Sequence, residues 1–158
     1  MRVREVQPSD EAQWRVLWDG YNSFYGAAVN ADVTSALWRR LTTPDDTVFG
    51  RVAEDAYGLS GFALCVLHPY TWGTSPACLL EDLYVDPRRR GGGVGRSLVD
   101  SLILEAKTRR WARLYWHTRQ DNAAARRLYD SYTASDGFVR YMLSFSGAVP
   151  TTGGSSLP

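Results

Sequence analysis

Three arginines run directly into three glycines, from Arg88 to Gly93, and Gly95 follows one residue later. An apolar predicted strand precedes this stretch and a predicted helix follows it. At such a junction the N–H groups of the first helical turn are free and the helix dipole adds partial positive charge, so an anion can bind. Glycines let the backbone approach closely, and arginines add charge and donors. The stretch therefore predicts a loop that holds a phosphate group rather than a solvated basic turn.

The glycine spacing excludes the two commonest nucleotide-binding motifs. The dinucleotide fingerprint needs a third glycine where this sequence has Arg96 or Leu98. The P-loop motif fails as well, because no Lys-Ser/Thr pair follows the glycines. Residues 90–95 instead fit the spacing Arg/Gln-x-x-Gly-x-Gly/Ala.

With that spacing the sequence resembles the GNAT superfamily of acetyl-CoA-dependent N-acetyltransferases. Residues 80–87 are similar to the strand before the family's pyrophosphate loop, 121–129 to its later helix and 137–141 to its final strand. Residues 18–25 and 115–118 resemble a narrower branch that acetylates histones, polyamines and amino acids. The resemblance implies a GNAT-like acyl-CoA N-acyltransferase fold. It also implies direct acetyl transfer to a primary amine of a small cationic molecule or of a lysine side chain.

The resemblance also implies which residues bind acetyl-CoA. Backbone N–H groups of the glycine loop would hold the pyrophosphate, and the end of the preceding strand would pair with the pantetheine arm. One strand N–H would polarise the thioester carbonyl, which is an oxyanion-hole role. The cofactor-binding residues expected on this basis are Leu83, Tyr84, Val85, Arg90, Gly91, Gly92, Gly93, Val94, Gly95, Arg96, Asn122 and Tyr129.

Acetyl transfer to an amine needs a base for the acceptor and an acid for the leaving thiolate. An alkylammonium has a pKa of about 10.4, so its proton must be removed near neutral pH. By resemblance Glu81 is the expected base, and Asp82, His68 and His117 are the alternatives. On a regular strand Glu81 and Asp82 would face opposite sides, so only one would point into a cleft unless a bulge intervenes. Tyr129 is similar to the family's general-acid tyrosine.

The acceptor is expected to bind to aromatic and acidic residues beyond the glycine loop. Tyr21 and Tyr25 end the apolar face of a predicted helix, where core packing is the alternative role. The expected substrate-binding residues are Tyr21, Tyr25, His68, Trp72 and Glu81. The alternative function is a non-catalytic nucleotide- or nucleic-acid-binding module that uses the basic loop from Arg88 to Arg96. The formal net charge of only +1 counts against nucleic acid as a partner.

The elements that must position these residues alternate between strands and helices. Strands are expected at 3–6, 47–54, 59–67, 77–85, 113–118 and 138–145. One helix starts at residues 8–10, a second starts at Thr34, a third follows the glycine loop, and Asp121 or Asn122 caps a fourth. This order predicts an α+β domain with α/β-type layering. Its central sheet would be mixed and mostly antiparallel, with helices on both faces.

Length and composition fit a single globular domain. Of the 158 residues, 1–146 are expected to form one N-acetyltransferase domain and 147–158 a flexible C-terminal tail. No membrane span or signal peptide is expected, so a cytoplasmic location is the default. Cys65 and Cys78 form neither a disulfide framework nor a zinc site, and a symmetric hairpin would place the two reduced thiols opposite each other. No metal is expected, and the resemblance leaves room for a homodimer.

Overall fold

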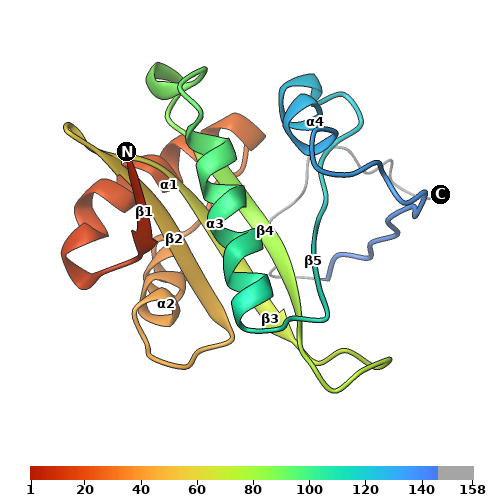
Figure 1. Cartoon of the computed structure of the whole chain (residues 1–158). Helices are drawn as coiled ribbons and strands as arrows, with labels where there is room; N and C mark the ends of the chain where they lie inside the picture. Colours follow the sequence, from red (N-terminus) through yellow and green to blue (C-terminus); the bar gives the residue numbers. More distant parts are fainter. Residues whose placement is uncertain (146–158) are drawn as a thin grey trace.

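A mixed sheet forms the centre of the computed structural model, which describes residues 1–145. The strands are β1 (Arg2–Glu5), β2 (Val48–Asp55), β3 (Gly58–His68), β4 (Ala77–Val85) and β5 (Arg113–Trp116). They lie in the order β1-β2-β3-β4-β5 (Figure 1). The first three pairs of neighbours are antiparallel, and β4 and β5 are parallel. The expectation of a mixed, mostly antiparallel sheet is therefore confirmed.

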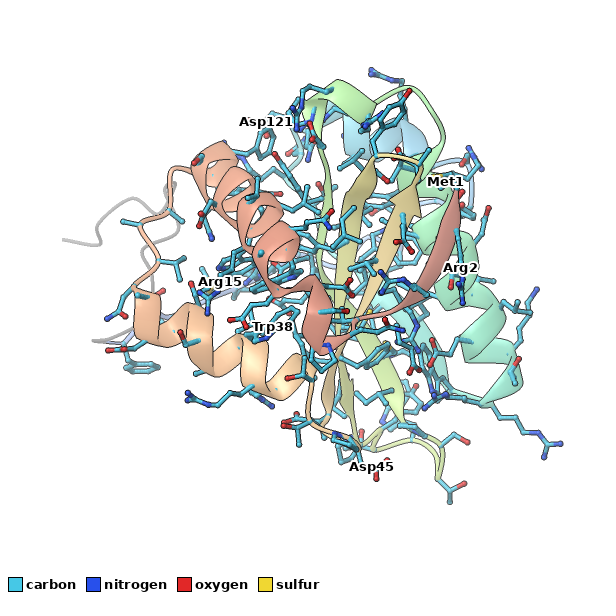
Figure 2. All side chains as sticks on the ribbon, turned by 90° about the vertical axis from the view of Figure 1, so that its left-hand side faces the viewer. Met1, Arg2, Arg15, Trp38, Asp45 and Asp121 are labelled. Atoms are coloured by element: carbon cyan, nitrogen blue, oxygen red, sulfur yellow. The ribbon has the colours of Figure 1, made fainter. Side chains whose placement is uncertain are left out.

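Helices cover both faces of this sheet, as predicted. The helices are α1 (Glu11–Tyr25), α2 (Ala31–Leu41), α3 (Val94–Thr108) and α4 (Ala123–Tyr129), with short 3-10 turns at Pro8–Asp10 and Pro87–Arg89. In Figure 2 the sheet is seen nearly edge-on, with α1 and α2 on one side and α3 on the other. Helix α3 forms the crossover that a parallel pair such as β4 and β5 requires.

The apolar face of α1 forms the core of the first layer. Trp14, Leu17 and Trp18 are buried there against Phe62 of β3. Helix α2 begins earlier than expected, because the side chain of Asn30 accepts a hydrogen bond from the backbone N–H of Asp32 and caps the helix. Thr34, the predicted cap, instead lies within α2, and its side chain is buried. Its hydroxyl accepts a hydrogen bond from the indole of Trp18, at 3.2 Å.

A β-bulge in β4 determines which of its side chains face each layer. Leu64 of β3 lies opposite Asp82, and the next residue, Cys65, lies opposite Leu80, so Glu81 is an extra residue in β4. The extra residue shifts the alternation of side chains along the strand. Leu80 consequently packs under α3, whereas Asp82 and Tyr84 face α1.

The two cysteines are not directly opposite each other, because the hairpin between β3 and β4 is not symmetric about them. Cys65 pairs in register with Leu80, and Cys78 pairs with Leu67. Both thiols are reduced and fully buried in the core under α3. Burial and the neighbouring Cys78 raise the pKa of the Cys65 thiol well above its usual value.

The predicted strand at 138–145 is wrong for the single chain. These residues pair with no other strand among the described residues, and Phe138 and Tyr141 are 90% and 92% exposed. A strand needs a hydrogen-bonded neighbour, and Figure 1 shows the chain after α4 looping out beyond β5. The expected tail at 147–158 lies outside the described residues, so the domain boundary at residue 146 stays a prediction.

Candidate active site

The glycine loop joins β4 to α3 through left-handed backbone conformations. Gly91 and Gly93 both have φ of +81°, a region in which a side chain would be strained. Gly93 is the N-cap of α3 and no side chain caps this helix, so the N–H groups of its first turn face outward. A Cβ at Gly95 would lie 3.3 Å from Leu128 of α4, so this glycine also permits close packing of α4. This geometry suits an anion such as a pyrophosphate.

The arginines of the loop divide into two groups. Arg88 forms an ion pair with Asp86 at 2.7 Å, and Arg89 lies 3.6 Å from Asp55. The Arg88 guanidinium holds the pKa of Asp86 below its usual range. Arg90 lies over the ring of Phe24 at the end of α1, with 5.8 Å between guanidinium carbon and ring centre. Arg88 and Arg89 thus have acidic partners, whereas the Arg90 guanidinium donates a hydrogen bond to the backbone oxygen of Val85, at 3.3 Å.

Arg96 lies on the other side of the glycine loop, in the first turn of α3. Its guanidinium donates a hydrogen bond to the hydroxyl of Ser131 at 3.0 Å and lies 5.3 Å from the ring centre of Tyr132. Arg90 and Arg96 therefore lie at the two ends of the glycine loop. Arg90 contacts the end of α1, and Arg96 contacts the residues that follow α4.

Next to the loop, β4 and β5 separate. They pair only from Ala77 to Leu80 on β4 and from Arg113 to Trp116 on β5, and β4 then continues alone on this side through Val85. The backbone of residues 81–85 therefore faces a gap, where an extended ligand can form strand-like hydrogen bonds. We call the region between residues 81–85, the glycine loop and α4 the β4–β5 gap.

Asp82 lies beside this gap and is bonded to α1. The phenol of Tyr21 donates a hydrogen bond to its carboxylate. Burial of the carboxylate, together with the negative charge of Glu81, raises the pKa of Asp82 to about 6, while the bond from Tyr21 acts in the opposite direction. Glu81 itself is exposed at the bulge. Of the two adjacent carboxylates, Asp82 is thus the one held in a partly dehydrated position.

Tyr21 and Tyr25 extend the buried aromatic core toward the gap. The ring of Tyr21 stacks on Trp18 with 5.5 Å between ring centres, and Tyr25 lies 4.9 Å from Tyr21. Burial and the charge of Asp82 raise the pKa of Tyr25, whereas the charge of Arg119 lowers it. Their rings therefore pack on the core and their hydroxyl ends face charged groups, and substrate binding by these tyrosines stays a prediction.

Gly20 brings α1 close to β4. A Cβ at this position would collide with the hydroxyl of Tyr84. Tyr84 is buried, and its ring lies 6.2 Å from that of Tyr21 in an edge-on arrangement. A larger residue at position 20 would push α1 away from the strand that carries Asp82.

Helix α4 contributes Asn122 and Tyr129. The Asn122 side chain caps the helix by accepting a hydrogen bond from the N–H of Ala125, and it donates another to the hydroxyl of Thr118, each at 3.2 Å. The Tyr129 ring lies 5.3 Å from that of Trp116. Burial raises the pKa of Tyr129 to about 12, and its hydroxyl has no hydrogen-bond partner in the described part of the chain. This hydroxyl is therefore left for a ligand.

The structure does not bring all the expected site residues together. His68 lies opposite Ala77 at the start of β4, about 15 Å along the strand from Asp82. Its Nε2 lies 2.8 Å from the hydroxyl of Tyr115, and Trp72 is 87% exposed in the loop after β3. These residues form a separate group at the other end of β4.

Sequence reasoning missed Arg119, which follows β5 where it leaves the sheet. Its guanidinium forms an exposed ion pair with Asp121 at 3.1 Å and acts electrostatically on Tyr25. Only its position just after a predicted strand end could have indicated it. Within residues 1–145, no group of three or more His, Cys, Asp or Glu side chains could hold a metal ion.

Comparison with known proteins identifies the class. Residues 12–132 match the model of the acetyltransferase (GNAT) family. The chain therefore belongs to the GNAT family, and it is an N-acetyltransferase; enzymes of this family generally use acetyl-CoA. The glycine loop, the uncapped start of α3 and the unpaired strand end fit such a cofactor.

Characterised relatives act on different amines. D-amino-acid N-acetyltransferase HPA3 of Saccharomyces cerevisiae is 30% identical over 141 residues, which cover 88% of either chain. Aminoglycoside N(6')-acetyltransferase type 1 of Stenotrophomonas maltophilia is 30% identical over 103 residues, 61% of either chain.

Solved structures confirm the fold. A probable acetyltransferase superposes with a TM-score of 0.82 at 22% identity, covering 94% of this chain and all of the other. Ribosomal-protein-alanine N-acetyltransferase from Brucella melitensis has a TM-score of 0.76 at 20% identity, covering 92% of this chain and all of the other. No helix within residues 1–145 is both long and apolar enough to cross a membrane.

Proposed function

We propose that this protein transfers an acetyl group from acetyl-CoA directly to the primary amine of a small cationic molecule, and that the reaction takes place in the β4–β5 gap. The observation that carries the proposal is the Tyr21–Asp82 pair beside this gap, next to an anion-binding glycine loop. A lysine side chain remains a second class of acceptor.

The glycine loop and its flanking arginines would hold the cofactor. The N–H groups from Gly91 to Arg96 would bind the pyrophosphate, and Arg90 and Arg96 would add positive charge on either side. Backbone groups of residues 83–85 would pair with the pantetheine arm, and one N–H there would stabilise developing negative charge on the carbonyl oxygen. Acetyl-CoA, when bound, supplies the acetyl group as a reactive thioester.

Asp82 is our choice for the base. With a pKa of about 6 it is ionised near neutral pH yet accepts a proton more readily than an ordinary carboxylate. The hydrogen bond from Tyr21 fixes the orientation of the Asp82 carboxylate. Glu81 is the extra residue of the bulge, and it is exposed. Glu81, the base expected from the family resemblance, is the rival assignment.

Tyr129 would supply the proton for the departing thiolate. The phenol is protonated at neutral pH and its hydroxyl has no partner among the described residues, so it can donate to sulfur. Direct transfer is supported by the burial of Cys65 and Cys78 under α3, away from the gap. Two reduced thiols are also typical of the cytoplasm, which is the location we propose.

An amino acid is the acceptor that Arg119 favours. Asp82 and the aromatic faces of Tyr21 and Tyr25 suit an ammonium group. Arg119 acts electrostatically on Tyr25, and its positive charge would suit an acceptor carboxylate if that group replaces the exposed ion pair with Asp121. The relative that acetylates D-amino acids supports this choice, and the aminoglycoside relative supports the polycationic alternative.

The test is an acceptor panel read by thiol release from acetyl-CoA. Amino acids of both hands, aminoglycosides, polyamines and basic peptides would be compared at fixed cofactor concentration. We expect the highest kcat/KM with amino acids, and we expect Arg119→Gln to raise the KM for them while leaving polyamines unaffected. Salt-sensitive DNA binding without any thiol release would instead favour the nucleic-acid-binding alternative.

A further inference from the structure

The β4–β5 gap has an open end and a closed end. It is open beyond Val85, where β4 leads toward the glycine loop, and it closes at the last pair of the parallel ladder, which joins Leu80 to Trp116. An extended ligand that starts at the glycine loop and follows β4 from residue 85 to residue 81 therefore has its last atoms at this pair.

Apolar side chains line the gap on the face of the sheet that α3 covers. Leu83 comes from β4, Trp116 from β5, and Leu128 and Tyr129 come from α4. All four pack against the core cluster under α3, yet each is only half-buried. Part of their surface is therefore left for an apolar group of a ligand.

Trp116 is the member of this set that lies at the closed end. Its ring centre is 5.3 Å from that of Tyr129, with 43° between the two planes. Leu80, its partner in the ladder, is buried, with 2% of its surface exposed. The indole thus lies between the end of the ladder and helix α4.

We propose that Trp116 restricts the acyl group of the donor to acetyl. This role rests on the proposed function, in which the Tyr129 hydroxyl faces the thioester sulfur. The acyl carbon is bonded to that sulfur, so each further methylene extends from Tyr129 toward the closed end, where it meets the indole. An acetyl group has a single methyl beyond its carbonyl carbon and avoids this contact.

The indole is held on several sides, so it cannot move aside for a longer chain. Its backbone is paired with Leu80, and its ring packs on Tyr129 and on the core under α3. Inserting methylene groups into packed space forces side chains out of their preferred rotamers. A pocket without room for one methylene discriminates by about 10–200-fold.

The other face of β4 gives a longer acyl chain no alternative place. On that face the carboxylate of Asp82 accepts the hydrogen bond of Tyr21, and this is where we place the acceptor amine. An acyl chain bound there would exclude the acceptor. Selection for a short acyl group therefore depends on the side that carries Trp116.

Calorimetric titration without any acceptor tests the role of Trp116 on binding alone. Coenzyme A, acetyl-CoA and butyryl-CoA are titrated into the full-length wild type and into Trp116→Val, which keeps a residue suited to a strand. The wild type should bind butyryl-CoA at least about tenfold more weakly than acetyl-CoA. In Trp116→Val this difference should fall below about threefold, while the affinity for coenzyme A, which has no acyl group, stays within about threefold.

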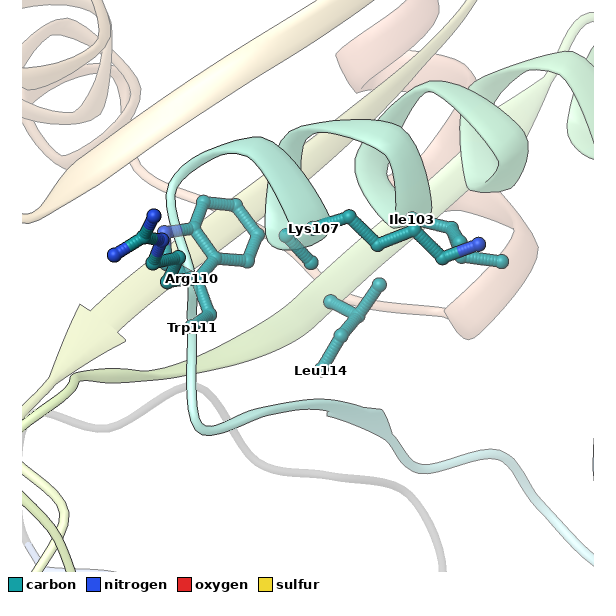
Figure 3. A pocket seen from close by; sticks show the side chains of 6 residues that line it. Ile103, Lys107, Arg110, Trp111 and Leu114 are labelled. Carbon is teal, nitrogen blue, oxygen red and sulfur yellow. The ribbon is translucent and has the colours of Figure 1, made fainter.

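Trp111→Val is the matched control. Trp111 is also half-buried against the core under α3, and its ring centre lies 5.8 Å from that of Phe49. It lines a hollow of about 420 Å³ under the C-terminal half of α3, together with Ile103 and Leu114 (Figure 3). This variant loses an indole away from the gap, so it should discriminate against butyryl-CoA as the wild type does.

A second substitution covers the case in which Trp116→Val does not fold, which circular dichroism would reveal. Trp116→Phe keeps an aromatic ring beside Tyr129 but is smaller than the indole. It should bind propionyl-CoA within about threefold of acetyl-CoA, whereas the wild type should bind propionyl-CoA at least about tenfold more weakly.

The outcomes separate this role from the proposed function. Equal affinity of the wild type for acetyl-CoA and butyryl-CoA overturns the role of Trp116 and leaves the proposed function standing. A tenfold difference that persists in a folded Trp116 variant does the same. A wild type that binds none of these coenzyme A compounds overturns the proposed cofactor site, and the role of Trp116 with it.

Discussion

The phenol of Tyr21 on α1 donates a hydrogen bond to the carboxylate of Asp82 on β4. This bond joins the helical layer to β4, whose last residues border the β4–β5 gap. It depends on two backbone features, the bulge at Glu81 and the close approach of α1 at Gly20.

Asp82→Asn should lower kcat by about 10²–10⁴-fold, because the amide cannot accept the proton of the acceptor amine. The matched control is Glu81→Gln on the neighbouring residue, which we expect to change kcat by less than about tenfold. Steady-state rates with a saturating acceptor decide between the two. A large loss in Glu81→Gln with a mild effect in Asp82→Asn would reverse the assignment of the base.

The pH dependence should follow the carboxylate of Asp82. The base works only when ionised, so the rate should rise as the pH passes through about 6. Tyr21→Phe removes a bond that lowers the pKa of Asp82, so the rise should move to higher pH. Rate profiles between pH 5 and 9 test this, and an unmoved rise in Tyr21→Phe would contradict it.

Folding stability should respond to Asp82 in the opposite sense to activity. Its pKa in the folded chain, about 6, lies above the ordinary value of 3.8, so the folded state binds the proton more tightly. The stability that this group contributes is present below pH 3.8 and is lost as the pH rises through 6. Asp82→Asn should therefore gain about 1–3 kcal/mol at pH 7. Denaturant unfolding of both proteins at pH 4 and pH 7 measures the difference, which should shrink at the lower pH.

Gly93→Ala should strain the left-handed backbone at the start of α3 by about 1–2 kcal/mol. The strained loop should also bind acetyl-CoA at least tenfold more weakly. Gly73→Ala serves as the control, because Gly73 has no positive φ and an added Cβ would make only ordinary contacts. Calorimetric titration with acetyl-CoA and thermal unfolding give the two quantities. Equal affinity in both variants would argue against the loop as the pyrophosphate site.

Tyr129→Phe should lower kcat by about 10²-fold and leave the acetyl-CoA dissociation constant nearly unchanged. The phenyl ring keeps its packing on Trp116, so only the hydroxyl is lost. Rates across pH, paired with direct measurement of cofactor binding, separate the two effects. An unchanged rate at every pH would remove Tyr129 from the chemistry.

The glycine loop and most elements of the fold could be predicted because their signals are local. Gly91, Gly93 and Gly95 are required by backbone conformation and close packing, and the apolar spacing of α1 and α3 is visible within single helices. Asn122 directly precedes α4 and caps it through its side chain, which is one of the two caps that the sequence predicts.

The bulge could not be located from the sequence, and the predicted strand at 138–145 does not form in the chain, because each feature depends on a neighbouring strand. The extra residue Glu81 results from the register between β3 and β4, which no local pattern in β4 specifies. The side-chain pattern at 138–145 is typical of a strand, but a strand also needs a hydrogen-bonded neighbour, which the local pattern does not specify.

The bulge at Glu81 has a kinetic consequence. Because it turns Asp82 toward α1 while the glycine loop leads into α3, the two reactants would approach one strand from opposite sides of the sheet. Neither would obstruct the path of the other. We therefore expect a ternary complex that assembles in either order, with intersecting rather than parallel lines in double-reciprocal plots and with coenzyme A competing against acetyl-CoA alone.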